Sequence, residues 1–158
     1  MPEHFGAKPS GYLLVHWEEL MNFDAPAGYG SVTPYLSVVD AAVVLEFAGA
    51  VFDATVTERI TDDEGGIRHA EFRIGGSLLM TGSVGDPANA RASVLYVYSS
   101  DCDEIYRRAL AAGGTSVSEP ADQVYGDRTA AFKGPAGNQW HVATRKETLT
   151  EAEIQARS

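Results

Sequence analysis

The chain has 158 residues, of which 44% are hydrophobic and 22% charged, and its formal net charge at pH 7 is −10. This length fits one ordinary domain, or two small halves that share a core. The negative charge repels phosphates, so it argues against a nucleic-acid partner and favours cationic ligands. No apolar run reaches the roughly 18 residues that span a bilayer, so we expect no membrane partner.

The N-terminus and the cysteine content bear on location and redox chemistry. Residues 1–10 lack the basic-then-apolar pattern of a secretory signal, which predicts a cytoplasmic location. Cys102 is the only cysteine, so the chain can form neither an internal disulfide nor a multi-cysteine metal site. Asp101, Asp103 and Glu104 surround it and should raise the pKa of its thiol, which argues against a nucleophilic role.

Residues 1–28 precede the regular pattern of the chain and are predicted to form an N-terminal extension. Between residues 11 and 23, four apolar side chains recur at i, i+4, i+7 and i+8, as on one face of a helix, although Tyr12–Val15 could equally begin a strand. We expect this part to be an arm that packs on the main body or on a partner subunit. The four apolar residues are Leu13, Trp17, Leu20 and Met21.

The main part of the chain contains a stretch that occurs twice. Residues 31–40 and 92–101 each form an alternating strand pattern that ends in an acidic cap and leads into an amphipathic helix. More strand patterns follow each helix, which predicts two tandem βαβββ modules, residues 29–84 and 91–146, and a tail at 147–158. The predicted fold class is therefore α+β, a curved mixed sheet with a concave cavity and helices on its outer face.

In the first module, a strand is predicted over residues 32–38, and Asp40 is placed to cap the helix that follows. Two later strands are joined by Gly75-Gly76, which is typical of a hairpin. The strands predicted after the helix cover residues 55–60, 67–74 and 77–81. The buried stripe of the helix is Val44, Phe47, Ala48 and Val51.

In the second module, Asp101 and Glu104 form a capping-box pattern, and Gly113-Gly114 ends the helix. Thr150 and Glu153 repeat the capping pattern in the tail, which predicts a short exposed helix. The inner face of the module-two helix is Ile105, Ala109 and Ala112. The strands predicted after it lie near residues 116–118, 128–133 and 139–145.

Alternation along the strands separates the side chains that meet a helix from those free to line a cavity. Leu36, Val38, Ala70 and Phe72 fall on the helix side, and Trp140 is expected in the core. The opposite side mixes aromatic rings with His, Glu and Arg, as in a ligand pocket, although such residues could also simply bond to one another. This second set is Thr33, Tyr35, His69, Glu71, Arg73, Met80, Val94, Tyr96, Tyr98 and His141.

Four segments in the same order and spacing resemble those of the vicinal oxygen chelate superfamily. This superfamily holds glyoxalase I, extradiol dioxygenases, fosfomycin-resistance enzymes and bleomycin-binding proteins, and the chain looks most like its PhnB-like branch. The resemblance spans about residues 29–155 and implies the paired βαβββ fold more than any single reaction. The segments are residues 32–42, 66–75, 122–128 and 137–144.

The resemblance also implies where a metal would bind. Metal-using members take ligands from the first and last strand of each half, which here correspond to Thr33, Met80, Val94 and His141. Only His141 is a good ligand for a divalent metal, so no cofactor is expected. A non-standard divalent metal site made by His69, Glu71 and His141 stays open as an alternative.

Three functions remain open. The leading hypothesis is a metal-free homodimer, similar to the drug-sequestering and antibiotic-resistance relatives, that binds an aromatic or cationic small molecule. The first alternative is a small-metabolite enzyme (a lyase, isomerase or dioxygenase-like protein) using His69, Glu71 and His141 as acid, base or metal ligands. The second is a structural or regulatory dimer whose cavity is filled by the arm at 11–23. The predicted ligand-binding residues are Tyr35, His69, Glu71, Arg73, Tyr96, Tyr98, Tyr125, Arg128 and His141.

Overall fold

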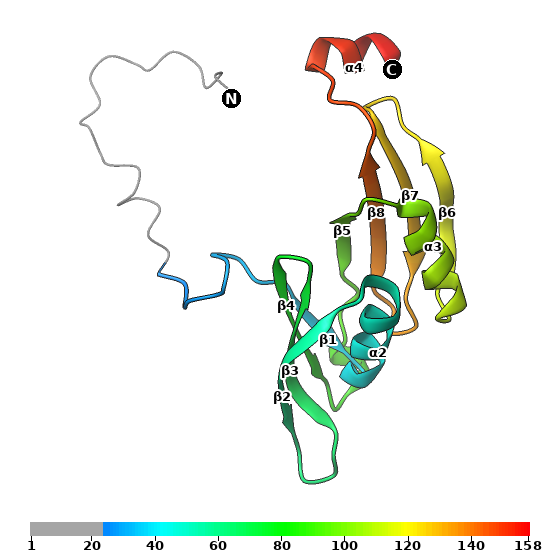
Figure 1. Ribbon diagram of the computed structural model, residues 1–158. Coiled ribbons are helices and arrows are strands. Elements are labelled where there is room, and N and C mark those ends of the chain that lie inside the picture. Colours follow the sequence, from blue (N-terminus) through cyan, green and yellow to red (C-terminus); the bar gives the residue numbers. More distant parts are fainter. Residues whose placement is uncertain (1–23) are drawn as a thin grey trace, which may run out of the picture.

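The structure is a computed structural model that describes residues 24–158 (Figure 1). It confirms the predicted α+β fold, because a strand, a helix and three further strands follow one another twice along the chain. The predicted arm at 11–23 lies outside the described residues. Within residues 24–158, no helix is both long and apolar enough to cross a membrane.

Module one is a mixed four-stranded sheet with one helix. The strand order is β1-β4-β3-β2, with β1 parallel to β4 and the other neighbours antiparallel. The predicted hairpin at Gly75-Gly76 is confirmed, and Gly75 takes the positive φ of 55° that a tight turn requires. The elements are β1 (Tyr35–Val38), α2 (Ala41–Phe52), β2 (Thr55–Thr61), β3 (Ile67–Ile74) and β4 (Ser77–Ser83).

Module two repeats this topology, with strand order β5-β8-β7-β6 and β5 parallel to β8. Its strand β6 is longer than the predicted 116–118, because it pairs with β7 through the backbone while its side chains stay mostly exposed. Pro120 is tolerated there because it falls within a register shift of an edge strand. After a 3-10 turn (Pro87–Asn89), the elements are β5 (Val94–Tyr98), α3 (Cys102–Ala111), β6 (Thr115–Asp122), β7 (Asp127–Lys133), β8 (Gln139–Arg145) and α4 (Glu151–Arg157).

The helix starts follow the predicted capping residues. The Asp40 carboxylate accepts a hydrogen bond from the Ala42 backbone N–H, and Asp101 accepts one from Glu104. In the tail, Thr150 and Glu153 form a complete capping box. The predicted stripe of α2 is buried along its whole length.

The two modules share one aromatic core. Phe47 and Phe52 of α2 reach across to module two, where Phe47 lies 6.0 Å from Phe132 of β7 and Phe52 lies 5.0 Å from Trp140 of β8, centroid to centroid. Helices α2 and α3 also pack on each other (Figure 1). Both sheets therefore bury their helix sides in the same core, as alternation predicted, and each turns its opposite face outward.

Replacing Trp140 tests this shared core. Its side chain is 1% exposed and contacts residues of both modules. We expect Trp140→Ala to lower the free energy of unfolding by about 3–5 kcal/mol, because it leaves a large cavity. Urea unfolding followed by circular dichroism measures the change, with the exposed Leu110→Ala as the control. A loss below about 1 kcal/mol, as for a surface substitution, would contradict the shared core.

Candidate functional site

The outward face of module one, here face one (Tyr35, His69, Glu71, Arg73 and Met80), combines aromatic and charged groups. Tyr35 of β1 stacks on His69 of β3 with ring centroids 5.9 Å apart. Gly82 permits this position, because a Cβ there would lie 2.4 Å from the Tyr35 hydroxyl oxygen. His69 Nε2 lies 3.6 Å from a Glu71 carboxylate oxygen, so ring and carboxylate form an ion pair whenever the imidazole is protonated.

Glu71 is a buried carboxylate, only 7% exposed, and a residue of the segment before β1 (residues 24–34) holds it in place. The Tyr29 hydroxyl donates to Glu71, with its oxygen 2.7 and 2.9 Å from the two carboxylate oxygens. This hydrogen bond is the main cause of a raised pKa at Tyr29. Arg73 fastens the same segment by donating to the carbonyl oxygen of Gly28 at 2.5 Å. The sequence marked this segment as the start of the module, but nothing in its pattern indicated that Tyr29 reaches the face.

Glu58 joins face one because of a β-bulge. The register of β2 against β3 shifts between Val56, which opposes Phe72, and Glu58, which opposes Glu71. Strict alternation would keep Glu58 on the side of Val56, so sequence reasoning missed it; the shift moves it across. One ligand atom each from Glu58, His69 and Glu71 lies within 4.8 Å of the other two.

The outward face of module two, face two (Val94, Tyr96, Tyr98, Gln139 and His141), is aromatic. Tyr96 and His141 are stacked almost parallel, with centroids 5.9 Å apart and 8° between their planes. The Tyr98 ring lies 5.4 Å from Tyr96, and the Gln139 amide nitrogen lies 2.9 Å from His141 Nε2. Burial, followed by the hydrogen bond with Tyr125, raises the pKa of Tyr96 to about 12. Tyr125 therefore adjoins this face.

The two faces are equivalent in scaffold and different in chemistry. Tyr35 opposes Met80 in module one, and Tyr96 opposes His141 in module two. At the next strand Glu71 opposes Met80, whereas Ala131 opposes His141. The repeat thus keeps one tyrosine on each first strand, and only module one places a carboxylate beside it.

The structure separates some residues that were predicted together. His69 and Glu71 lie on face one with Glu58, whereas His141 lies on the sheet of module two, so the cluster of possible ligands does not include it. Arg128 does not join the tyrosines of either face. Its guanidinium pairs with Asp103 of α3 at 2.7 Å and with Asp122 at 3.2 Å, because its position on β7 points to the helix side.

Arg145 is a face-two residue that the sequence did not single out. It pairs with the buried carboxylate of Asp127, and its guanidinium carbon lies 5.9 Å from the centroid of the Tyr98 ring. This cation–π distance adds one basic group to the aromatic face. The carboxylate of Asp127, which follows the turn, is thus held by Arg145.

The strand positions used by metal-binding relatives do not fit a metal in this chain. Of the four positions, Thr33 precedes β1, Met80 lies opposite Tyr35, Val94 lies opposite Gln139 and His141 lies opposite Tyr96. Only His141 is a good divalent-metal ligand. Cys102 is also a poor candidate for a nucleophile. It is buried, and this burial is the largest cause of the raised pKa of its thiol, with Asp103 adding to it.

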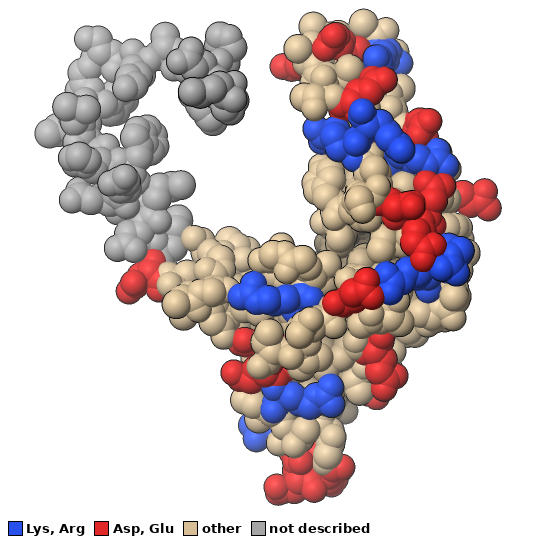
Figure 2. All heavy atoms as spheres, viewed as in Figure 1, with Lys and Arg blue, Asp and Glu red and all other residues tan. Residues whose placement is uncertain are grey.

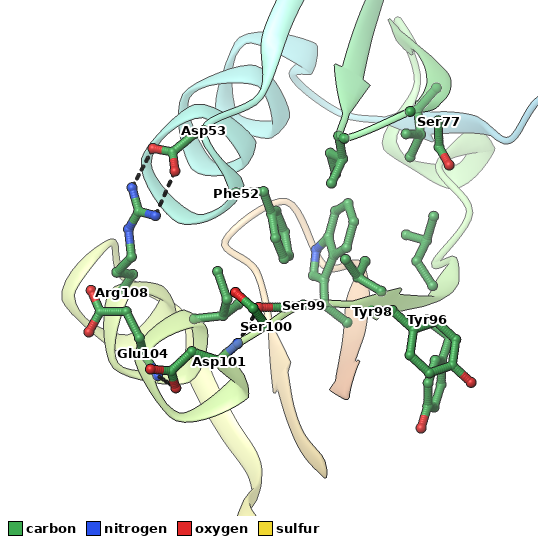
Figure 3. Close-up of a pocket in the computed structure, with 18 of the residues that line it drawn as sticks. Phe52, Asp53, Ser77, Tyr96, Tyr98, Ser99, Ser100, Asp101, Glu104 and Arg108 are labelled. Carbon is green, nitrogen blue, oxygen red and sulfur yellow. Dashed lines mark hydrogen bonds and ion pairs between the residues drawn. The ribbon is translucent and has the colours of Figure 1, made fainter. Parts of the chain in front are cut away.

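A cleft of about 690 Å³ lies where the modules meet, on the helix side of β5 (Figure 3). Phe52 and Trp140 are among the residues that line it, and the rings of Tyr96 and Tyr98 project to one side (Figure 3). At its rim Arg108 of α3 donates to both carboxylate oxygens of Asp53, at 2.5 and 2.9 Å, so an ion pair joins the modules. This bond holds the pKa of Asp53 below its usual value.

Charged side chains over module two are largely paired. Figure 2 shows red and blue groups against one another there, in keeping with ion pairs such as Glu104 with Arg107 and Asp103 with Arg128. On face one, by contrast, no Lys or Arg among residues 24–158 forms an ion pair with Glu58 or Glu71. With Glu58 and Glu71 against the single cation Arg73, face one therefore keeps a net negative charge.

Comparison with known families agrees with this fold. The model of the Glyoxalase/Bleomycin resistance protein/Dioxygenase superfamily matches residues 28–142. The chain belongs to this superfamily. An uncharacterized protein of Mycobacterium bovis is 30% identical over 137 residues, which cover 80% of this chain and 90% of that protein. Its counterpart in Mycobacterium tuberculosis H37Rv has the same identity and covers 80% and 81%.

Solved structures of other proteins share the fold. TioX from Micromonospora sp. ML1 is 25% identical with a TM-score of 0.63, over 72% of this chain and 97% of that one. A PhnB protein from Bacillus cereus has a TM-score of 0.62 at 19% identity, over 73% and 99%. The second likeness is one of fold alone.

The raised pKa of Tyr96 can be tested by alkaline titration. In the folded protein Tyr96 should stay protonated past pH 11, because its pKa is about 12 rather than the usual 10.0. In the folded protein, Tyr96→Phe should then leave the tyrosinate absorbance below pH 11 unchanged. In the protein unfolded by urea, the same substitution should remove one tyrosine ionisation near pH 10. The folded state binds the phenolic proton of Tyr96 more tightly than the unfolded state does. The free energy of unfolding that this proton contributes is therefore lost as the pH rises from about 10 to 12. Loss of an ionisation near pH 10 in the folded variant would contradict the raised pKa of Tyr96.

Proposed function

We propose that the protein binds a small aromatic molecule, neutral or cationic, in a pocket enclosed by the outward faces of two chains. The observation that carries the proposal is the parallel stack of Tyr96 and His141 beside Tyr98 on face two. Tyr96 is 48% exposed although its ring is large and apolar, so it offers a flat surface to a further ring. Tyr35, 49% exposed and stacked on His69, offers a second one on face one.

A homodimer would complete the pocket. Within residues 24–158, β1 and β5 each have a hydrogen-bonded neighbour on one side only, and large apolar side chains are exposed near them. Open edges and exposed apolar patches are typical of surfaces that another chain covers. Pairing face one of one chain with face two of another would place Tyr35 opposite Tyr96. The exposed residues include Val32, Tyr35, Val94, Tyr96 and Tyr98.

The charge of face one favours a neutral or cationic ligand over an anionic one. Glu58 and Glu71 face the same side as Tyr35, and the tyrosine rings themselves attract cations. The proposal needs no metal at the strand positions that other members of the superfamily use. We place this activity in the cytoplasm, and sequestration of an antibiotic is one use to which such a pocket is suited.

Binding can be tested with proflavine, a planar aromatic cation, in a fluorescence titration. We expect saturable binding that Tyr96→Ala weakens by about tenfold, because one aromatic contact contributes roughly 1 kcal/mol in addition to its buried area. The anionic dye anilinonaphthalene sulfonate should bind more weakly than proflavine.

The matched control is Leu110→Ala, which removes a similarly exposed side chain from α3, on the helix side of the sheet. It should bind proflavine like the unaltered protein. Binding that neither Tyr96→Ala nor Tyr35→Ala changes would overturn the proposal, as would the absence of saturable binding.

The dimer can be tested by sedimentation velocity. We expect a particle of twice the chain mass of 16.9 kDa. Val94→Glu should raise the dissociation constant of the dimer about tenfold, because Val94 is 71% exposed on face two and a charge buried there would oppose pairing. Leu110→Glu should leave the mass unchanged. A protein that sediments as a single chain at all concentrations would exclude this form of the pocket.

A further inference from the structure

We infer that Glu58, His69 and Glu71 form a binding site for one divalent transition metal on face one. Their ligand atoms, two carboxylate oxygens and one imidazole nitrogen, converge within 4.8 Å of one another. A metal ion with bonds of about 2.0–2.2 Å would hold these atoms less than about 4.4 Å apart. His69 Nε2 already lies 3.6 Å from a Glu71 oxygen, and a small rotation of the exposed Glu58 side chain would complete the set. The site lies on β2 and β3. It therefore differs from the positions on the first and last strands of each module, whose side chains do not fit a metal.

The backbone brings these groups together. His69 and Glu71 are two residues apart on β3 and therefore share a side of the sheet. The bulge in β2 then sets Glu58 directly opposite Glu71. Like charges directly opposite on neighbouring strands destabilise a sheet, and among residues 24–158 no Lys or Arg pairs with either carboxylate. A bound cation would remove this repulsion.

Neighbouring groups hold two of the three ligands in position. The Tyr29 hydroxyl donates to both oxygens of Glu71, which fixes the plane of that carboxylate. The Tyr35 ring packs on the imidazole of His69 and limits its rotation. Hydrogen bonds and packing behind the ligands are the usual means by which proteins orient metal-binding side chains.

The donor set indicates the kind of metal. Imidazole with carboxylates suits Zn²⁺, Co²⁺, Fe²⁺ or Mn²⁺, whereas Mg²⁺ and Ca²⁺ prefer oxygen ligands alone. Glu58 is exposed and Glu71 is buried, so the cluster opens to solvent on one side. Three protein ligands would leave a position there for water or for an oxygen atom of a small molecule. This inference does not depend on aromatic binding by face two.

Cobalt is a suitable probe, because its visible absorption reports both binding and the ligand set. The full chain is stripped of metal with a chelating resin and titrated with Co²⁺, by absorption and by calorimetry. We expect stoichiometric uptake whose affinity falls at least about tenfold in Glu58→Gln and in His69→Gln. Glu58 is exposed, so Glu58→Gln should fold normally, as circular dichroism can verify.

Two control variants make the test specific. Glu119→Gln removes an exposed carboxylate from β6, an edge strand in the same position of the other module, and should not change uptake. Glu151→Gln removes an exposed carboxylate from α4, which belongs to neither sheet, and should not change it either. The absence of stoichiometric uptake, uptake unchanged in both Glu58→Gln and His69→Gln, or uptake lost in Glu151→Gln would each overturn the inference. Proflavine binding by the metal-free protein is measured separately, so failure of one proposal is distinguishable from failure of the other.

Discussion

The packing of two phenylalanines of α2 against module two is the contact on which the rest of the structure depends. Phe47 and Phe52 lie against Phe132 and Trp140, so the helix of one module buries the sheet of the other. A sheet side that is covered by this core cannot also line a pocket. The tyrosine-bearing sides of both sheets must therefore face away from this core.

The internal repeat explains the scaffold, and departures from the repeat explain the chemistry. Each module places a tyrosine on its first strand, but the residue opposite is Met80 in one and His141 in the other. The position of Glu71 is taken by Ala131 in module two. One duplicated framework thus carries an acidic face and an aromatic face. A ligand that needs both carboxylates and stacked aromatic rings would have to contact face one and face two together.

Local features predicted much of the fold. The caps at Asp40 and Asp101, the buried stripe of α2 and the Gly75-Gly76 hairpin all depend on near neighbours in the chain, so their sequence signals are direct. Alternation also assigned Tyr35 and Tyr96 to outward faces. It failed at Glu58, because a bulge changes the register of β2 without a distinctive sequence. It gave no information on Tyr29, whose contact with Glu71 spans 42 positions.

The sequence by itself determined the two βαβββ modules, their buried sides and the single good metal ligand, His141, at the strand positions of the superfamily. Tertiary structure decided which outward groups meet. It brought Glu58 to His69 and Glu71 and left His141 on the other sheet. It also turned Arg128 toward Asp103 on α3. The physical reason is that alternation fixes only the side of a strand on which a residue lies, whereas bulges and the docking of the two modules fix its neighbours.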